Sequence, residues 1–71
     1  MDSQKLVALM KNESGTIKGF ADKIGVAYTT IFQATQSDEK LQRMSVTMFI
    51  NVANGLNMTA DELVKELVKS A

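Results

Sequence analysis

The sequence contains no cysteine, histidine, proline or tryptophan in its 71 residues. Without histidine and cysteine it lacks the commonest general base, the thiolate nucleophile and the commonest zinc ligands. It also lacks any apolar run close to the roughly 18 residues that a membrane span requires. Met1 to Lys5 is not followed by the apolar segment of a signal peptide. These absences predict a cytoplasmic protein that is not an enzyme and has no catalytic residues, metal, cofactor, small-molecule substrate or membrane contact.

Neither sign of charge is in excess, because eight acidic residues balance eight basic ones. Proteins that bind nucleic acid usually carry excess positive charge, so the composition by itself argues against DNA as a partner. A chain of this length is expected to form one domain, residues 1–71, and to bury only about 60% of its unfolded surface. Since no disulfide or thiolate metal site can add stability, the domain must depend on well-packed regular elements.

Apolar residues recur at helical spacing through almost the whole chain, and no stretch alternates for long enough to predict a strand. The sequence therefore predicts an all-α fold of five helices. The first begins at Asp2 or Ser3 and ends within residues 12–15. The second is capped by Thr16 and ends where Gly25 can adopt the left-handed conformation. Its buried stripe is expected to consist of Ile17, Phe20, Ala21 and Ile24.

The third predicted helix runs from about residue 27 to residue 35, and the polar segment 36–44 is predicted to be a solvated loop. Ser45 caps the fourth helix, whose left-handed end is supplied by Asn57 or Gly55. The fifth helix opens with a capping box, in which Thr59 and Glu62 each accept a hydrogen bond from the other's backbone N–H. One face of the fourth helix is expected in the core, and it consists of Val46, Phe49, Ile50, Ala53 and Leu56.

The second and third helices are separated by a short turn that contains glycine, which is the geometric signature of a helix-turn-helix. Ala21 is small where the third helix crosses the second, and Gly25 makes the turn. Val26 and Ile31 then anchor the third helix to the core. Because these residues face the core, they also determine which side of the third helix faces solvent.

At these residues the sequence resembles the Cro/C1-type (XRE-like) family of phage and bacterial transcriptional regulators. Residues 16–26 are similar to the family's T-x-x-x-hydrophobic-A-x-x-x-G-V pattern, and residues 29–31 to the start of its recognition helix. Residues 49–63 are similar to its fourth helix and its L-x-V-x-x-D-E-L ending. The resemblance covers residues 5–68 and implies a five-helix, lambda-repressor-like domain. It implies a repressor that binds double-stranded operator DNA as a homodimer, without a catalytic step.

Three positions depart from the family's pattern. Ile17 stands where the family usually has a glutamine that contacts phosphate, and Ala27 stands where a serine usually caps the recognition helix. The loop after the recognition helix is longer than usual and carries acidic residues beside Lys40 and Arg43. These changes weaken the electrostatic argument for DNA more than the argument for the fold.

Side chains near the start of a recognition helix enter the major groove, so the predicted base contacts are Tyr28, Thr29 and Gln33. An amide such as that of Gln33 can bond an adenine through two hydrogen bonds, and a threonine methyl can contact a thymine methyl. The predicted contacts to the DNA backbone are Thr16, Lys18, Thr30, Gln36, Lys40 and Arg43.

Each of these residues also has a simpler interpretation. The Tyr28 ring could cover the turn, Gln33 could be an ordinary solvated residue, and Lys40 and Arg43 could be loop charges paired with neighbouring carboxylates. Gly19 could admit a phosphate or another backbone segment, or be tolerated near a helix end. The adjacent carboxylates of residues 61 and 62 are explained by helix capping without a metal or catalytic role.

The last predicted helix carries more apolar surface than one core contact needs. Val64 and Val68 could form a dimer surface, or belong to one wide stripe in a monomer core. The alternative function comes from another class: a helical protein-interaction module that keeps the scaffold and meets a repressor or antirepressor partner. Net neutrality, Ile17 and Ala27 favour this alternative.

Overall fold

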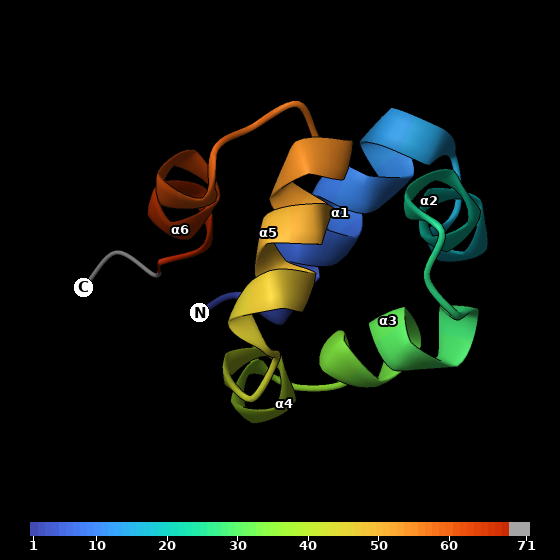
Figure 1. The fold of residues 1–71 in the computed structure, drawn as a ribbon. Coiled ribbons are helices and arrows are strands. Elements are labelled where there is room, and N and C mark those ends of the chain that lie inside the picture. The colour runs from blue at the N-terminus through green and yellow to red at the C-terminus, as the bar shows by residue number, and fades with distance from the viewer. Residues whose placement is uncertain (69–71) are drawn as a thin grey trace.

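The computed structural model describes residues 1–68, and this part of the chain is helical, with no strand. α2 contacts α1, α3 and α5, while α6 packs on α1 and α5. Figure 1 shows α1 and α5 at the centre, α2 and α3 on one side, α6 on the other, and α4 beyond the end of α3. The described helices are α1 (Ser3–Ser14), α2 (Ile17–Ile24), α3 (Tyr28–Ala34), α4 (Asp38–Gln42), α5 (Val46–Gly55) and α6 (Ala60–Leu67).

Side-chain caps start the helices where the sequence predicts them. The Asp2 carboxylate accepts hydrogen bonds from the first backbone N–H groups of α1, at 3.0 and 3.1 Å. Thr16 does the same for α2 at 2.9 Å, and Ser45 for α5 at 3.1 Å. α3 begins at Ala27, which offers no side-chain cap. Because a capping bond joins residues only two or three positions apart, these helix starts could be predicted from the local sequence.

The capping box of α6 is confirmed. The Thr59 hydroxyl accepts from the Glu62 N–H at 3.1 Å, and the Glu62 carboxylate accepts from the Thr59 N–H at 3.0 Å. The Thr59 backbone N–H, and after it the Thr59 side chain, lower the pKa of the Glu62 carboxyl below its ordinary value. The carboxylate thus stays charged at the positive end of the helix dipole.

The core lies where α1, α2, α5 and α6 meet, and α3 and α4 each contribute side chains to it. Phe20 and Ala21 are fully buried, as the sequence predicts, whereas Ile17 and Ile24 at the edges of the same stripe are half-buried. The fully buried large side chains are Leu6, Met10, Phe20, Ile31, Leu41, Val52, Leu63 and Leu67.

Among residues 1–68, three residues that follow helix ends have a positive φ: Gly15 at 81°, Gly25 at 73° and Asn57 at 60°. Gly55 is the last residue of α5 and is buried, but it does not adopt the left-handed conformation. A Cβ atom there would collide with Ile24 and would lie 2.9 Å from Cζ of Phe20. Glycine at this position therefore lets α5 approach α2 closely.

The predicted solvated loop at residues 36–44 is wrong, because this segment contains α4 and raises the described helices to six. Ser37 caps α4, and Leu41 is buried with 1% of its surface exposed. Oδ1 of Asp38 accepts from both the backbone N–H and the hydroxyl of Ser3, each at 2.9 Å. One buried residue in a five-residue helix produces no apolar period, and the Ser3 partner lies 35 positions away. The sequence pattern therefore could not reveal this helix.

The predicted core face of α5 is also partly wrong. Val46 and Ile50 are exposed, at 75% and 43% of their surface, whereas Val52 is buried. Of the other predicted members, Ala53 is buried, and Phe49 and Leu56 are half-buried. α5 carries apolar residues on most of its circumference, so its sequence does not single out one stripe. The side that is buried is set by the approach to α2 at Gly55.

We expect Leu41→Ala to destabilise the protein by about 2–5 kcal/mol, because it removes a buried side chain and leaves a cavity. Gln42→Ala, at the adjacent exposed position, is the matched control and should change stability by no more than about 0.5 kcal/mol. Urea unfolding followed by circular dichroism measures both. Equal stability of the two variants would contradict the packing of α4 and restore the solvated loop.

Candidate nucleic-acid interface

α2 and α3 are joined by a tight turn of residues 25–27. The Gly25 N–H donates to the carbonyl oxygen of Asp22 at 3.2 Å, and the Val26 N–H donates to that of Ala21 at 3.0 Å. α3 is held through Ile31 and Ala34, of which 1% and 8% of the surface is exposed. With one side buried at these two residues, α3 can present only its opposite side to a partner.

The exposed side of α3 carries the three residues predicted to contact bases. Tyr28, Thr29 and Gln33 are all exposed on it. At 3.6 residues per turn, Thr29 and Gln33 lie one above the other on this side, directly away from the buried Ile31 and Ala34. The structure therefore brings the predicted base contacts together on one surface.

Phe32 belongs to the same surface, and the sequence reasoning missed it. Its ring stacks on that of Tyr28, with the ring centroids 5.5 Å apart and the planes inclined by 21°. The two residues keep 39% (Tyr28) and 40% (Phe32) of their surface exposed. The spacing of four residues was the available signal, since side chains at i and i+4 on a helix are neighbours.

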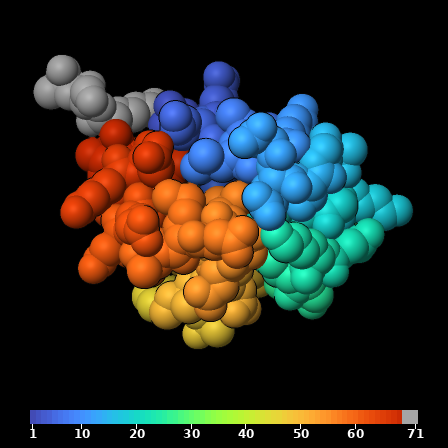
Figure 2. Space-filling view, turned by 90° about the horizontal axis from the view of Figure 1, so that it is seen from above, coloured from blue at the N-terminus to red at the C-terminus, as the bar shows by residue number. Residues whose placement is uncertain are grey.

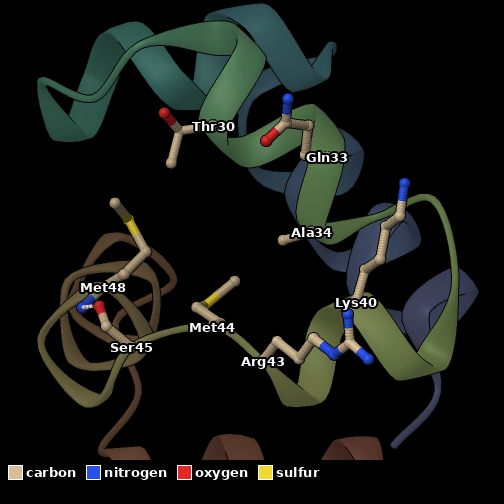
Figure 3. A pocket seen from close by; sticks show the side chains of 8 residues that line it. All are labelled: Thr30, Gln33, Ala34, Lys40, Arg43, Met44, Ser45 and Met48. Carbon is tan, nitrogen blue, oxygen red and sulfur yellow. Dashed lines mark hydrogen bonds between the residues drawn. The ribbon is translucent and has the colours of Figure 1, made fainter.

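A hollow of about 330 Å³ lies beside α3. Figure 3 shows Thr30 and Gln33 on α3 above it, Lys40 and Arg43 on the α4 side, and Met44 and Met48 on the side of α5. Four of its residues were predicted DNA contacts, whereas its methionines and Ser45 were not. It is lined by Thr30, Gln33, Ala34, Lys40, Arg43, Met44, Ser45 and Met48.

The charges around the hollow are only partly neutralised. Nη2 of Arg43 lies 2.7 Å from Oε1 of Glu39, and about three-quarters of each side chain is exposed. Such an exposed pair contributes only roughly 0.2–1 kcal/mol, so it holds Arg43 weakly. The predicted pairing of the acidic residues with loop cations thus holds for Glu39, while Asp38 bonds to Ser3 on α1.

The beginning of α2 contains two further predicted backbone contacts, Thr16 and Lys18. The Thr16 hydroxyl caps the helix at Gly19, and Lys18 is exposed in the first turn. Gly19 is explained by close packing, because a Cβ there would lie 3.0 Å from the carbonyl oxygen of Ser14. The last predicted contact, Gln36, is exposed after α3 but does not line the hollow.

A second surface lies on α5 and α6, and we call Val46, Ile50, Val64 and Val68 the α5–α6 apolar surface. Val46 and Ile50 lie on the side of α5 opposite Gly55, which contacts α2. On α6, 38% of Val64 is exposed, and 56% of Val68 just after it. In Figure 2 the red and orange atoms of α6 adjoin the orange and yellow atoms of α5.

Two further features bear on what this chain could bind. Among residues 1–68, no cluster of three or more acidic side chains is placed to hold a metal ion. In the same part of the chain, no helix is both long enough and apolar enough to cross a membrane.

No protein-family model, curated protein or solved structure matches this chain. Its function must therefore be inferred from its residues and their arrangement.

Proposed function

We propose that this protein is a sequence-specific DNA-binding regulator of the Cro/C1 type, which represses transcription by occupying its operator. The observation that carries the proposal is the arrangement of α3. One side of this helix is anchored by Ile31 and Ala34, while Thr29 and Gln33 project from the other beside a hollow with two cations at its rim. Polar side chains for base edges and cations for phosphates thus lie next to each other.

The dimensions of α3 suit the major groove of DNA. An α-helix with its side chains is about 10–12 Å in diameter, and the groove is about 12 Å wide. In a helix-turn-helix, the second helix enters the groove and the first crosses the backbone. α3 and α2 would take these two parts, with the exposed side of α3 facing the bases.

Gln33 is the residue best suited to read a base. Its amide can donate to N7 and accept from N6 of an adenine in a bidentate pair, which discriminates against other bases by roughly 1–3 kcal/mol. Thr29 and Tyr28 are its neighbours on the same side of α3 and would contact adjacent bases. Lys40, Arg43 and Thr30 border the same hollow and would position one strand of the duplex, while Thr16, Lys18 and Gln36 would contact phosphates nearby.

The distribution of charge makes net neutrality compatible with DNA binding. Glu13 pairs with Lys23 at 2.6 Å, and Glu66 with Lys5 at 3.7 Å, so these two neutral pairs add no net charge beside α3. Glu62 serves its own helix end on α6. The phosphate backbone would meet the local charges beside α3 rather than the sum over the chain.

The α5–α6 apolar surface would join two copies of the protein. Four exposed aliphatic side chains suit contact with an identical surface around a two-fold axis. The longest dimension of the subunit is 33 Å, and α3 and α6 lie on different sides of it (Figure 1). Two recognition helices about 34 Å apart would each lie about 17 Å from the two-fold axis, which is within this length.

A protein-interaction module is the second candidate function. The exposed Tyr28–Phe32 pair favours it, since aromatic residues are enriched in protein interfaces. In this case the outer side of α3 would meet a protein, such as another repressor or its antagonist, without strong DNA binding. The scaffold is compatible with both functions, because a fold does not determine what its surface binds.

The first test is binding to random and genomic duplexes in a salt series, followed by fluorescence anisotropy. If each subunit makes about three phosphate contacts, the dimer should lose affinity with a log–log salt slope of roughly −5. The absence of any salt-dependent binding at low ionic strength would exclude the DNA-binding function and leave the protein-interaction module.

The second test separates base contacts from backbone contacts. Gln33→Ala should cost roughly 1–3 kcal/mol on the preferred sequence and little on others, so that base preference is relaxed. Lys40→Ala should weaken binding to all duplexes alike and make the salt slope shallower by about 1 per subunit, because one cation no longer meets a phosphate. Asn12→Ala, at an exposed position of α1, is the control. The same effect from Gln33→Ala and Lys40→Ala would refute the assigned roles.

The third test concerns the dimer. Replacement of both Val64 and Val68 by aspartate places like charges at the two-fold contact and should shift the protein to monomers in sedimentation equilibrium. Asn12→Asp adds the same kind of charge elsewhere and should leave self-association unchanged. A wild-type protein that stays monomeric at high concentration, or a double variant that associates as the wild type does, would refute this interface.

A further inference from the structure

The outer side of α3 exposes two of the four aromatic residues in the protein. Phe20 is fully buried and Phe49 half-buried, so both have a role in the core. Tyr28 and Phe32 instead keep about two-fifths of their surface in contact with solvent. The anchoring of α3 by Ile31 and Ala34 does not require them, so their exposed rings call for a separate explanation.

The two rings form an ordered apolar platform. They are four residues apart on one helix, and their stacked arrangement limits the rotation of each side chain. Around the axis of α3, the order is Tyr28, Phe32, Thr29 and Gln33. An apolar stripe therefore runs beside the polar stripe that is proposed to read bases.

We infer that the Tyr28–Phe32 platform contacts the C5-methyl group of thymine in the major groove and makes thymine a determinant of the operator sequence. This inference rests on the proposed function. Phe32 is then a specificity-determining residue next to Gln33, and the thymine methyl group is the ligand of the apolar stripe.

The chemistry of the groove supports this assignment. The C5-methyl group of thymine is the one apolar group that the base pairs present in the major groove. On α3 the Phe32 ring lies beside the Gln33 amide. In the major groove, the methyl group of a thymine next to N6 and N7 of an adenine would offer a matching pair of contacts. Lys40 and Arg43 border the hollow on the Gln33 side of α3, where they would hold the phosphates of a duplex whose bases face the platform.

The experiment begins with the selection of preferred duplexes from a randomised pool by the wild-type protein. Each dT of the selected site is then replaced singly by dU, which removes the methyl group and leaves the pairing edge intact. Burial of one such carbon corresponds to about a fourfold change in affinity. We expect this loss at one or two thymines of each half-site, and unchanged affinity when the other thymines are replaced.

Phe32→Ala completes a double-mutant cycle with the dT→dU change. The variant should lose at least fourfold in affinity for the dT duplex and show no further loss on the dU duplex at the contacted position. Phe32→Leu, which keeps an apolar side chain, should retain part of the discrimination. Circular dichroism verifies that both variants are folded, and Asn12→Ala should behave as the wild type on both duplexes.

The outcomes distinguish this inference from the proposed function. Salt-dependent binding with equal affinity for all dT and dU duplexes would overturn the thymine contact and leave DNA binding in place. A Phe32→Ala variant that weakens both duplexes equally would also overturn it, since the ring would then act only on the structure of α3. No salt-dependent binding to any duplex would overturn the proposed function itself and point to a protein as the ligand of the rings.

Discussion

The close approach of α5 to α2 at Gly55 is the constraint on which most of the structure depends. No Cβ fits there, because Ile24 and Phe20 occupy its place. Lys23 strengthens the same contact by donating to the Gly55 carbonyl oxygen at 2.8 Å while it pairs with Glu13 on α1. α2 is therefore held against α1 and α5 at once, and it is the element that carries the turn into α3.

Both surfaces with a proposed function follow from this contact. Because α2 is held against α5, the turn at Gly25 directs α3 so that Ile31 is buried and Gln33 is exposed. Because the Gly55 side of α5 is buried, Val46 and Ile50 on its opposite side are exposed. One close contact in the core thus leaves a polar surface suited to DNA on one side of the molecule and an apolar surface suited to a second copy on another.

α4 and the residue after it place two cations beside α3. In α4, Leu41 is buried and Asp38 bonds to Ser3, so the short helix is fixed to the rest of the protein at two positions. This placement puts Lys40 and Arg43 at the rim of the hollow next to Gln33. If this surface binds DNA as proposed, local charge matters more than the sum over the chain, because charges act over about 10 Å at ordinary ionic strength.

The sequence alone determined the all-α class, the caps at Asp2, Thr16, Ser45 and Thr59, and the glycine turn at Gly25. Each of these depends on residues within about one helical turn, so the pattern contains all that is needed. Only the tertiary structure decided that residues 38–42 are helical, that Phe32 stacks on Tyr28 in solvent, and that Val46 and Ile50 are outside the core. These features depend on which distant partners occupy each side of a helix. In the sequence, an apolar residue contributes to the helical period in the same way whether it is buried against another helix or exposed to solvent.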